Sequence, residues 1–165
     1  MEYFELKSDT LVVTDPCYNR DTISNDAGGI IKNCLPGKWF CFTTIMKNMG
    51  TRVSELHILH EKYLTAHHLY SELDAPFDVS VDSGQAGVFD AEQYPHGETG
   101  DYGDETTFYG RACAATEHGL SGVITEGFVS RSGFGDGGYP AFIGITNDQK
   151  CVSVRVVFID EEGGE

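Results

Sequence analysis

Positive charge is scarce in this chain. Its 11 Lys and Arg residues stand against 26 Asp and Glu, which gives a formal net charge of −15 over 165 residues. Contact with nucleic-acid phosphates requires Lys and Arg, and so does docking on an anionic membrane. The composition therefore argues against both kinds of partner. It leaves three roles for an acidic surface, namely solubility, attraction for cations and recognition of a basic protein partner.

Long hydrophobic runs are also missing from the sequence. No apolar segment approaches the ~18 residues that span a bilayer. Residues 1–5 lack the basic region and apolar core of a signal peptide. We therefore expect a cytoplasmic protein with no membrane association.

Cysteine spacing offers little for metal or disulfide chemistry. The chain contains no C-x-x-C pair, which disfavours a zinc ribbon. Because the cysteines are odd in number and follow no export signal, a disulfide framework is also disfavoured. Cys41 and Cys151 lie in apolar strand-like runs and are expected to be small buried hydrophobes. The five cysteines are Cys17, Cys34, Cys41, Cys113 and Cys151.

What the chain does contain is ordinary for one globular domain. Hydrophobic residues make up 40% of it, which argues against disorder. A chain of this length can bury roughly 70% of its unfolded surface. Neither an internal repeat nor a linker divides the sequence, so we expect a single domain over 1–165 with an acidic, frayed tail at 160–165.

Alternating apolar residues predict a β-rich fold of about eight strands. The expected strands are a hairpin of 3–7 with 11–13, a hairpin of 38–47 with 52–60, strands at 77–81 and 123–131, and a hairpin of 141–146 with 151–159. We therefore predict a mainly β (β-rich α+β) fold, either an antiparallel β-sandwich or a barrel, with one short helix.

The expected helix covers 106–117, with Asp104 as a candidate N-cap and Gly119 at its end. Residues 53–70 also fit a helical stripe, which is the alternative to a strand that ends near His60. Residues 19–29 are expected to form a loop.

Three loop segments combine carboxylates with glycine or proline. They are Thr14–Tyr18, Asp82–Gly87 and Ser132–Pro140. The last, with four glycines among nine residues, can adopt positive φ and come close to another surface. We expect the three segments to form one ligand-binding site. Its candidate residues are Asp15, Asp82, Ser83, Gln85, Asp136 and Tyr139.

Stretches of the chain resemble an uncharacterised family of bacterial and phage proteins of unknown function. They are Val13–Tyr18, Val81–Gly87 and Ser132–Pro140. The resemblance implies one compact β-rich domain and a bacterial or phage setting. It implies no activity, so it assigns no residue a role.

Three of the candidate residues, Asp15, Asp82 and Asp136, each stand at the end of an expected strand. If these strand ends converge, the three carboxylates could bind Ca²⁺ or Mg²⁺, with Ser83 and Gln85 completing the shell. The alternative is that each Asp caps its own turn by accepting backbone N–H bonds. No EF-hand spacing supports calcium.

Other reactive residues carry weaker signals. Cys17 would be a nucleophile if a His approached it, and a buried, inert thiol is the alternative. Ser83 does not match the G-x-S-x-G elbow of acyl-transfer enzymes. The glycine-rich segment lacks the Lys-Ser/Thr ending of a phosphate loop, although a nest of backbone N–H groups can still hold an anion.

The segment 92–104 and the residues just after it form an acidic, exposed loop interleaved with aromatic residues. The acidic and aromatic side chains could engage a basic partner, and a solvated loop is the alternative. The residues concerned are Glu92, Tyr94, Glu98, Asp101, Tyr102, Asp104 and Glu105.

Two functions remain open from the sequence. The first is a non-enzymatic binding or interaction module, such as a phage accessory protein that binds a small ligand or a host protein. It rests on the acidity and on the lack of a catalytic constellation. The second is a small metal-assisted hydrolase that uses the loop carboxylates Asp15, Asp82 and Asp136 with Tyr139.

Overall fold

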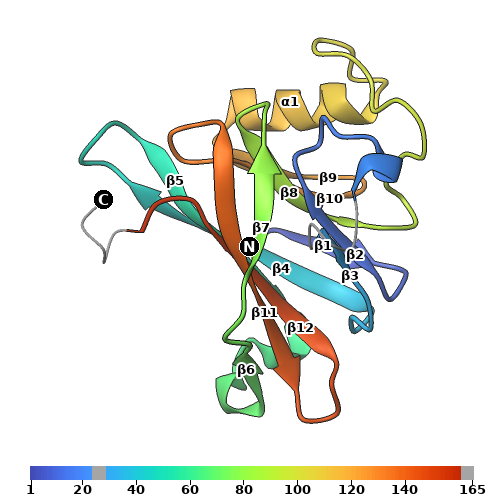
Figure 1. The fold of residues 1–165 in the computed structure, drawn as a ribbon, viewed down its shortest axis with the longest axis vertical. Helices are drawn as coiled ribbons and strands as arrows, with labels where there is room; N and C mark the ends of the chain where they lie inside the picture. Colours follow the sequence, from blue (N-terminus) through green and yellow to red (C-terminus); the bar gives the residue numbers. More distant parts are fainter. Residues whose placement is uncertain (24–28, 161–165) are drawn as a thin grey trace.

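The computed structural model describes residues 1–23 and 29–160, and it shows two antiparallel β-sheets covered on one side by a helix (Figure 1). The seven-stranded sheet has the order β1-β4-β5-β12-β11-β6, and β7 pairs with a further part of β11. The five-stranded sheet has the order β3-β2-β8-β10-β9. The predicted β-rich, sandwich-like fold with one helix is therefore confirmed.

The strands are β1 (Tyr3–Leu6), β2 (Leu11–Thr14), β3 (Ile30–Ile31), β4 (Gly37–Met46), β5 (Arg52–His60), β6 (Tyr70–Glu72), β7 (Phe77–Val81), β8 (Gln85–Asp90), β9 (Ser121–Ile124), β10 (Gly127–Arg131), β11 (Gly137–Thr146) and β12 (Cys151–Val157). The helices are α1 (Phe108–His118) and the short 3₁₀ turns η1 (Arg20–Thr22), η2 (Glu61–Tyr63) and η3 (His67–Leu69).

The five-stranded sheet has a hydrophobic core on each of its faces. Successive side chains of a strand point to opposite faces. In β2, Val13 joins the core between the two sheets, whereas Val12 joins a second core beneath α1. In β10, Phe128 lies in the core between the sheets and Val129 lies in the core beneath α1. The molecule is thus built in three layers, sheet, sheet and helix, and β8 is buried along its whole length.

In the seven-stranded sheet, side chains alternate between the core and the outer face, as the sequence predicts. In β5, Leu56 and Ile58 lie in the core between the sheets, while Glu55 and His57 are only half-buried. In β12, Val154 and Val156 likewise point inward. The predicted hairpins of β4 with β5 and of β11 with β12 are both present. The alternative helix over 53–70 is not formed, and only the short turns η2 and η3 follow β5.

The predicted hairpin between residues 3–7 and 11–13 is wrong. β1 pairs with β4 in the seven-stranded sheet, and β2 pairs with β3 and β8 in the other. The buried Asp90 carboxylate holds the connection, because it accepts bonds from the backbone N–H of Lys7 (2.8 Å) and from the Ser8 hydroxyl (2.6 Å). A contact across more than 80 positions therefore sends the chain from one sheet to the other.

Two further predictions are corrected in the C-terminal third. The single strand at 123–131 is a hairpin of β9 with β10. The glycine-rich segment Ser132–Pro140 is a turn only at its start, because β11 begins at Gly137 and pairs with β7. Helix α1 is capped by Thr107, whose hydroxyl accepts the Gly110 N–H bond, rather than by Asp104. Gly119 ends the helix as predicted.

No helix in the described ranges is long and apolar enough to cross a membrane. Of the predicted loop 19–29 and tail 160–165, residues 24–28 and 161–165 lie outside the described residues.

Candidate functional site

A cavity of about 390 Å³ opens where the C-terminal half of α1 faces the turn between β10 and β11. Five separate segments line it: the start of β5, the β7–β8 turn, the loop before α1, α1 itself and the β10–β11 turn. We call this cavity the α1 cleft. Its size is within the ~300–1,000 Å³ range of small-molecule sites.

Hydrogen bonds between β8 and α1 build the floor of the α1 cleft. The side-chain oxygen of Gln85 accepts a bond from the Thr116 hydroxyl (3.0 Å), and its amide nitrogen donates to the Cys113 sulfur (3.4 Å). Gln85 is buried and uses both ends of its amide in this way. Its role is to fix the helix on the strand, so it contacts a ligand only as part of the floor.

Tyr109 stands beside this floor and is half-buried. Burial, followed by hydrogen bonding to Cys113, raises the pKa of the Tyr109 phenol to about 12. The phenol therefore stays protonated at neutral pH and remains a hydrogen-bond donor.

Two arginines line the cleft, Arg52 at the start of β5 and Arg131 at the end of β10. Arg52 donates from Nε to the Met49 carbonyl (3.0 Å) and from one terminal nitrogen to the Gly133 carbonyl (3.3 Å). Arg131 donates only from Nε, to the Thr116 carbonyl (2.8 Å). Within residues 1–23 and 29–160, neither guanidinium has a carboxylate at ion-pair distance. In a chain with net charge −15, two arginines at one cavity that have no acidic partner among the described residues stand out.

The start of the glycine-rich segment forms the outer wall of the cleft. Gly133 (φ 63°) and Gly135 (φ 121°) adopt backbone conformations that disfavour a side chain. Between them, the exposed Phe134 ring lies 4.6 Å from the Arg52 guanidinium carbon, a cation–π contact. The predicted close approach of this segment to another surface is thus made by the turn Gly133–Gly135.

Asp15 lies behind the cleft and is completely buried. Its carboxylate accepts bonds from the backbone N–H groups of Cys17 (2.8 Å), Asp82 (2.7 Å) and Ser83 (2.7 Å). It also accepts the hydroxyl bond of Ser83 (2.6 Å). Four donors occupy its two oxygens, so Asp15 caps the β7–β8 turn and presents Ser83 to the cleft. The alternative from the sequence was that each Asp caps its own turn; Asp15 does so through Cys17 and also caps a turn 67 positions away.

Of the other predicted site residues, some line the α1 cleft and some do not. Ser83 and Gln85 line the α1 cleft, whereas Asp82, Asp136 and Tyr139 do not. The exposed Asp82 carboxylate accepts the Tyr18 hydroxyl bond, and the Tyr139 hydroxyl donates to the Gly135 carbonyl (2.5 Å). Within the described part of the chain, no group of three or more His, Cys, Asp or Glu side chains could hold a metal ion.

Cys17 is poorly suited to nucleophilic attack. Burial, with a further contribution from the nearby Asp15 carboxylate, raises the pKa of its thiol to about 12. The thiolate is the reactive form of cysteine, and at neutral pH almost none is present.

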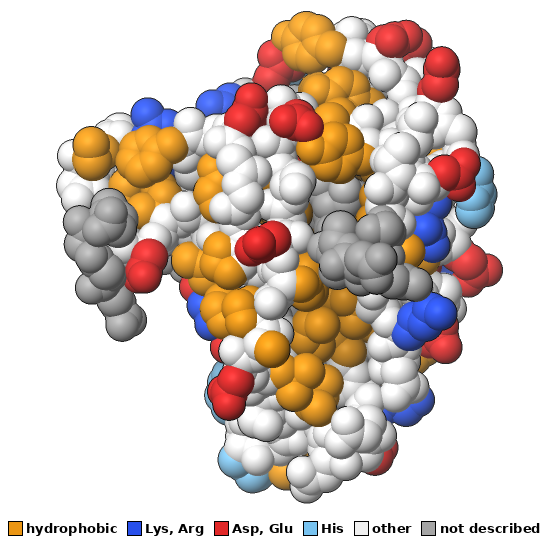
Figure 2. Space-filling model, viewed as in Figure 1, with side chains coloured by type: hydrophobic (Ala, Val, Ile, Leu, Met, Phe, Trp, Pro, Cys, Tyr) orange, Lys and Arg blue, Asp and Glu red, His pale blue; other side chains and the backbone are white. Residues whose placement is uncertain are grey.

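The acidic loop differs from its prediction in one respect. Tyr94 is 1% exposed, packs against Phe89 and Phe108 in the core beneath α1, and donates from its hydroxyl to the Tyr18 carbonyl (2.6 Å). It is therefore no anchor for a partner, whereas Tyr102 is 66% exposed. Figure 2 shows the Asp and Glu side chains of one face spread over it rather than gathered in a single patch.

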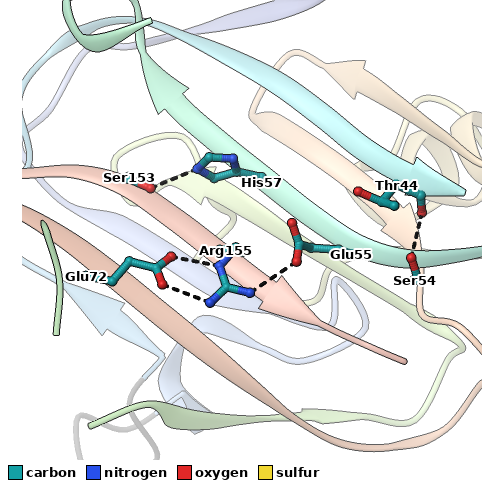
Figure 3. A network of polar contacts seen from close by, with 7 residues as sticks. All are labelled: Thr44, Ser54, Glu55, His57, Glu72, Ser153 and Arg155. Carbon is teal, nitrogen blue, oxygen red and sulfur yellow. Dashed lines mark hydrogen bonds and ion pairs between the residues drawn. The ribbon is translucent and has the colours of Figure 1, made fainter. Parts of the chain in front are cut away.

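A second polar network lies on the outer face of the seven-stranded sheet (Figure 3). The Arg155 guanidinium pairs with Glu72 through two bonds (2.7 and 2.8 Å) and with Glu55 (3.1 Å). Beside it, the His57 ring is bonded to the Ser153 hydroxyl (2.9 Å). Because Arg155 bonds to a carboxylate through each of its three nitrogens, this network ties β5, β12 and β6 together.

This network predicts part of the acid sensitivity of the fold. Hydrogen bonding to Arg155 lowers the pKa of Glu72 below its ordinary value of 4.5. A carboxyl with a lower pKa in the folded state stabilises the fold above the unfolded pKa, and this contribution is lost as the pH falls through the folded pKa. We expect Glu72→Gln to cost about 0.5–1 kcal/mol of unfolding free energy at pH 7, and we expect this cost to shrink as the pH falls below 4.5.

Urea denaturation at a series of pH values measures this difference. The exposed Glu61, changed to Gln, is the matched control and should show no such dependence. Equal losses for Glu72→Gln at pH 7 and at pH ~3 would contradict the ion-pair explanation.

Sequence reasoning missed most side chains of the α1 cleft. Tyr109, Cys113, Thr116 and Glu117 recur at spacings of four, three and one along the helix, which places them on one face. That polar stripe was visible in the sequence. The contribution of Arg52 was not, because it depends on how the β4–β5 hairpin lies across the glycine-rich turn.

Comparisons with protein-family models, with curated proteins and with solved structures found no match for this chain. The resemblance to the uncharacterised bacterial and phage family therefore stays a prediction.

Proposed function

We propose that this protein is a binding module that holds a small molecule in the α1 cleft. The observation that carries the proposal is the convergence of side chains from five segments on one cavity of about 390 Å³. Binding sites of this kind combine a concave shape with a few placed polar groups. The cleft has both, together with the aromatic rings of Phe134, Tyr102 and Tyr109 on its walls.

Binding is favoured over catalysis by the state of the reactive groups. The Ser83 hydroxyl donates to Asp15 (2.6 Å) and accepts a bond from the Gln85 amide (3.5 Å), and the Asp15 carboxylate already accepts three backbone N–H bonds. No histidine is among the lining residues, and the phenol of Tyr109 is held protonated. These groups recognise and orient a ligand without performing a proton transfer at neutral pH.

A small molecule is favoured over a basic protein partner. Of the aromatic residues of the acidic loop, Tyr94 is buried in the core, and the acidic side chains of the face in Figure 2 form no single patch. The cleft, in contrast, is concave, and hydrogen bonds join Gln85, Cys113 and Thr116 in its floor.

A ligand screen by nuclear magnetic resonance tests the proposal. Isotope-labelled protein is mixed with a library of metabolite-sized compounds, and amide chemical shifts are followed. We expect binding compounds to shift the amides of Ser83, Gly84, Gly133 and Gly135, which surround the cleft. Shifts confined to other parts of the molecule, or no shift with any compound, would overturn the proposal.

A further inference from the structure

The charge of the α1 cleft is opposite to that of the molecule. Arg52 and Arg131 both line it, although the chain has only 11 basic residues against 26 acidic ones. Arg111 and Arg155 differ from them, since each forms an ion pair with a carboxylate. Among residues 1–23 and 29–160, no carboxylate lies at ion-pair distance from Arg52 or Arg131, which leaves both available to an anion from outside.

Both guanidiniums keep free donors. A guanidinium has five N–H groups. Arg52 uses two of them, for the Met49 and Gly133 carbonyls, and Arg131 uses one, for the Thr116 carbonyl. These bonds to backbone oxygens fix the stems of the side chains. The remaining N–H groups suit the paired oxygens of a carboxylate or a phosphate.

One carboxylate also lines the cleft and limits how much negative charge it can accept. Glu117 is exposed at the mouth and accepts the Tyr102 hydroxyl bond (2.5 Å). With Arg52 and Arg131, it leaves the lining side chains with a formal net charge of +1. A singly charged carboxylate matches that charge, whereas a phosphate dianion would bring an excess negative charge next to Glu117.

The walls favour an aromatic or other flat body on that carboxylate. Phe134 is 54% exposed and Tyr102 is 66% exposed, and both rings line the cleft. Large exposed rings at the edge of a cavity are available to pack against a ligand. Phe134 already carries the Arg52 guanidinium at 4.6 Å, so the ring and the cation form one continuous surface.

Resting on the proposed function, we infer that the α1 cleft binds a small monocarboxylate with a flat apolar body. The carboxylate is held by Arg52 and Arg131, and the body lies between the rings at the mouth. Phosphate compounds and neutral molecules are the competing ligand classes.

Titrations with four simple probes test the inference, with the amide shifts of Gly133 and Gly135 as the readout. Benzoate and benzamide have the same shape and differ in charge, acetate lacks the ring, and inorganic phosphate represents the dianions. We expect benzoate to bind at least about tenfold more tightly than benzamide, and more tightly than acetate or phosphate.

Substitutions of charged residues that line the cleft provide a second test of the inference. Arg131→Gln should weaken benzoate binding about tenfold and leave benzamide unchanged, and Arg131→Lys should recover part of the loss because it keeps the charge without the fork. Glu117→Gln should strengthen benzoate binding. If Arg131→Gln unfolds the protein, Arg52→Gln replaces it. Thermal unfolding of each variant verifies folding.

The possible failures are distinguishable. Equal affinity for benzoate and benzamide, or a tighter complex with phosphate, would overturn the inference and leave ligand binding at the α1 cleft in place. If neither arginine variant changes the benzoate affinity, the inference is likewise overturned and ligand binding at the α1 cleft is not. If none of the probes shifts the cleft amides, the inference is overturned, and the compound library then decides the proposed function separately.

Discussion

Replacing Asp15 by Ala is expected to lower the free energy of unfolding by about 3–5 kcal/mol. The side chain is completely buried, and its carboxylate accepts three backbone N–H bonds and the Ser83 hydroxyl bond. Alanine removes the acceptor of all four donors. Each unsatisfied buried donor costs about 1–3 kcal/mol, and relaxation of the turn recovers part of the sum.

Two companion variants make the Asp15 measurement specific. Asp15→Asn keeps one acceptor oxygen and should cost less than Asp15→Ala. Asp82→Ala removes a neighbouring carboxylate that is exposed and accepts a single bond from Tyr18, so it should cost about 1 kcal/mol or less. Urea denaturation gives the three values. A loss for Asp15→Ala no larger than that for Asp82→Ala would show that Asp15 does not hold the β7–β8 turn.

The second large effect is expected at Gly110, in the first turn of α1. Helix propensity alone favours Ala over Gly by about 1 kcal/mol. A Cβ at Gly110, however, would lie 1.8 Å from the Asp104 carbonyl oxygen and 2.9 Å from that of Asp101. Both contacts are with backbone, so no side chain can move aside. We expect Gly110→Ala to destabilise the fold by about 3 kcal/mol, which is the opposite sign from the propensity.

Gly97→Ala is the matched control for the Gly110 measurement. A Cβ at Gly97 meets nothing within 4 Å, and its φ is not left-handed. It should change the unfolding free energy by less than about 0.5 kcal/mol. Thermal and urea unfolding give both values. A stabilised Gly110→Ala variant would mean that the loop before α1 does not pack on the helix as the structure has it.

The elements that the sequence predicts well are those with local causes. The hairpins of β4 with β5 and β11 with β12 join strands that are neighbours in sequence, and their side chains alternate between core and outer face. Helix α1 ends at Gly119, as its helix formers and glycine predict. The β-rich fold class follows from the same local patterns.

The elements that the sequence misses depend on distant contacts. Whether residues 3–6 and 11–14 form a hairpin or join different sheets is decided in part by Asp90, more than 80 positions away. Continuous burial of β8 follows from its position between a sheet and a helix, which no periodicity within six residues reveals.

The candidate site, too, was predicted from the sequence only in part. The β7–β8 turn and the glycine-rich segment were predicted to lie in a ligand site, and Ser83, Gln85 and the turn Gly133–Gly135 do line one cavity. Asp15, however, serves as a cap, and Asp82 and Asp136 lie outside the cleft. Local sequence identifies residues that can act in a site, whereas the partner each side chain finds decides whether it does.

The most direct test of ligand binding at the α1 cleft is to block its mouth. Glu117 lines the cleft, whereas the next residue, His118, lines a different cavity on the other side of α1. Both are exposed, so Glu117→Trp and His118→Trp place the same bulky side chain at adjacent positions. For the tightest compound of the library screen, we expect Glu117→Trp to abolish the shifts of Gly133 and Gly135, and His118→Trp to leave the affinity unchanged. Undiminished binding to a folded Glu117→Trp variant would contradict the account.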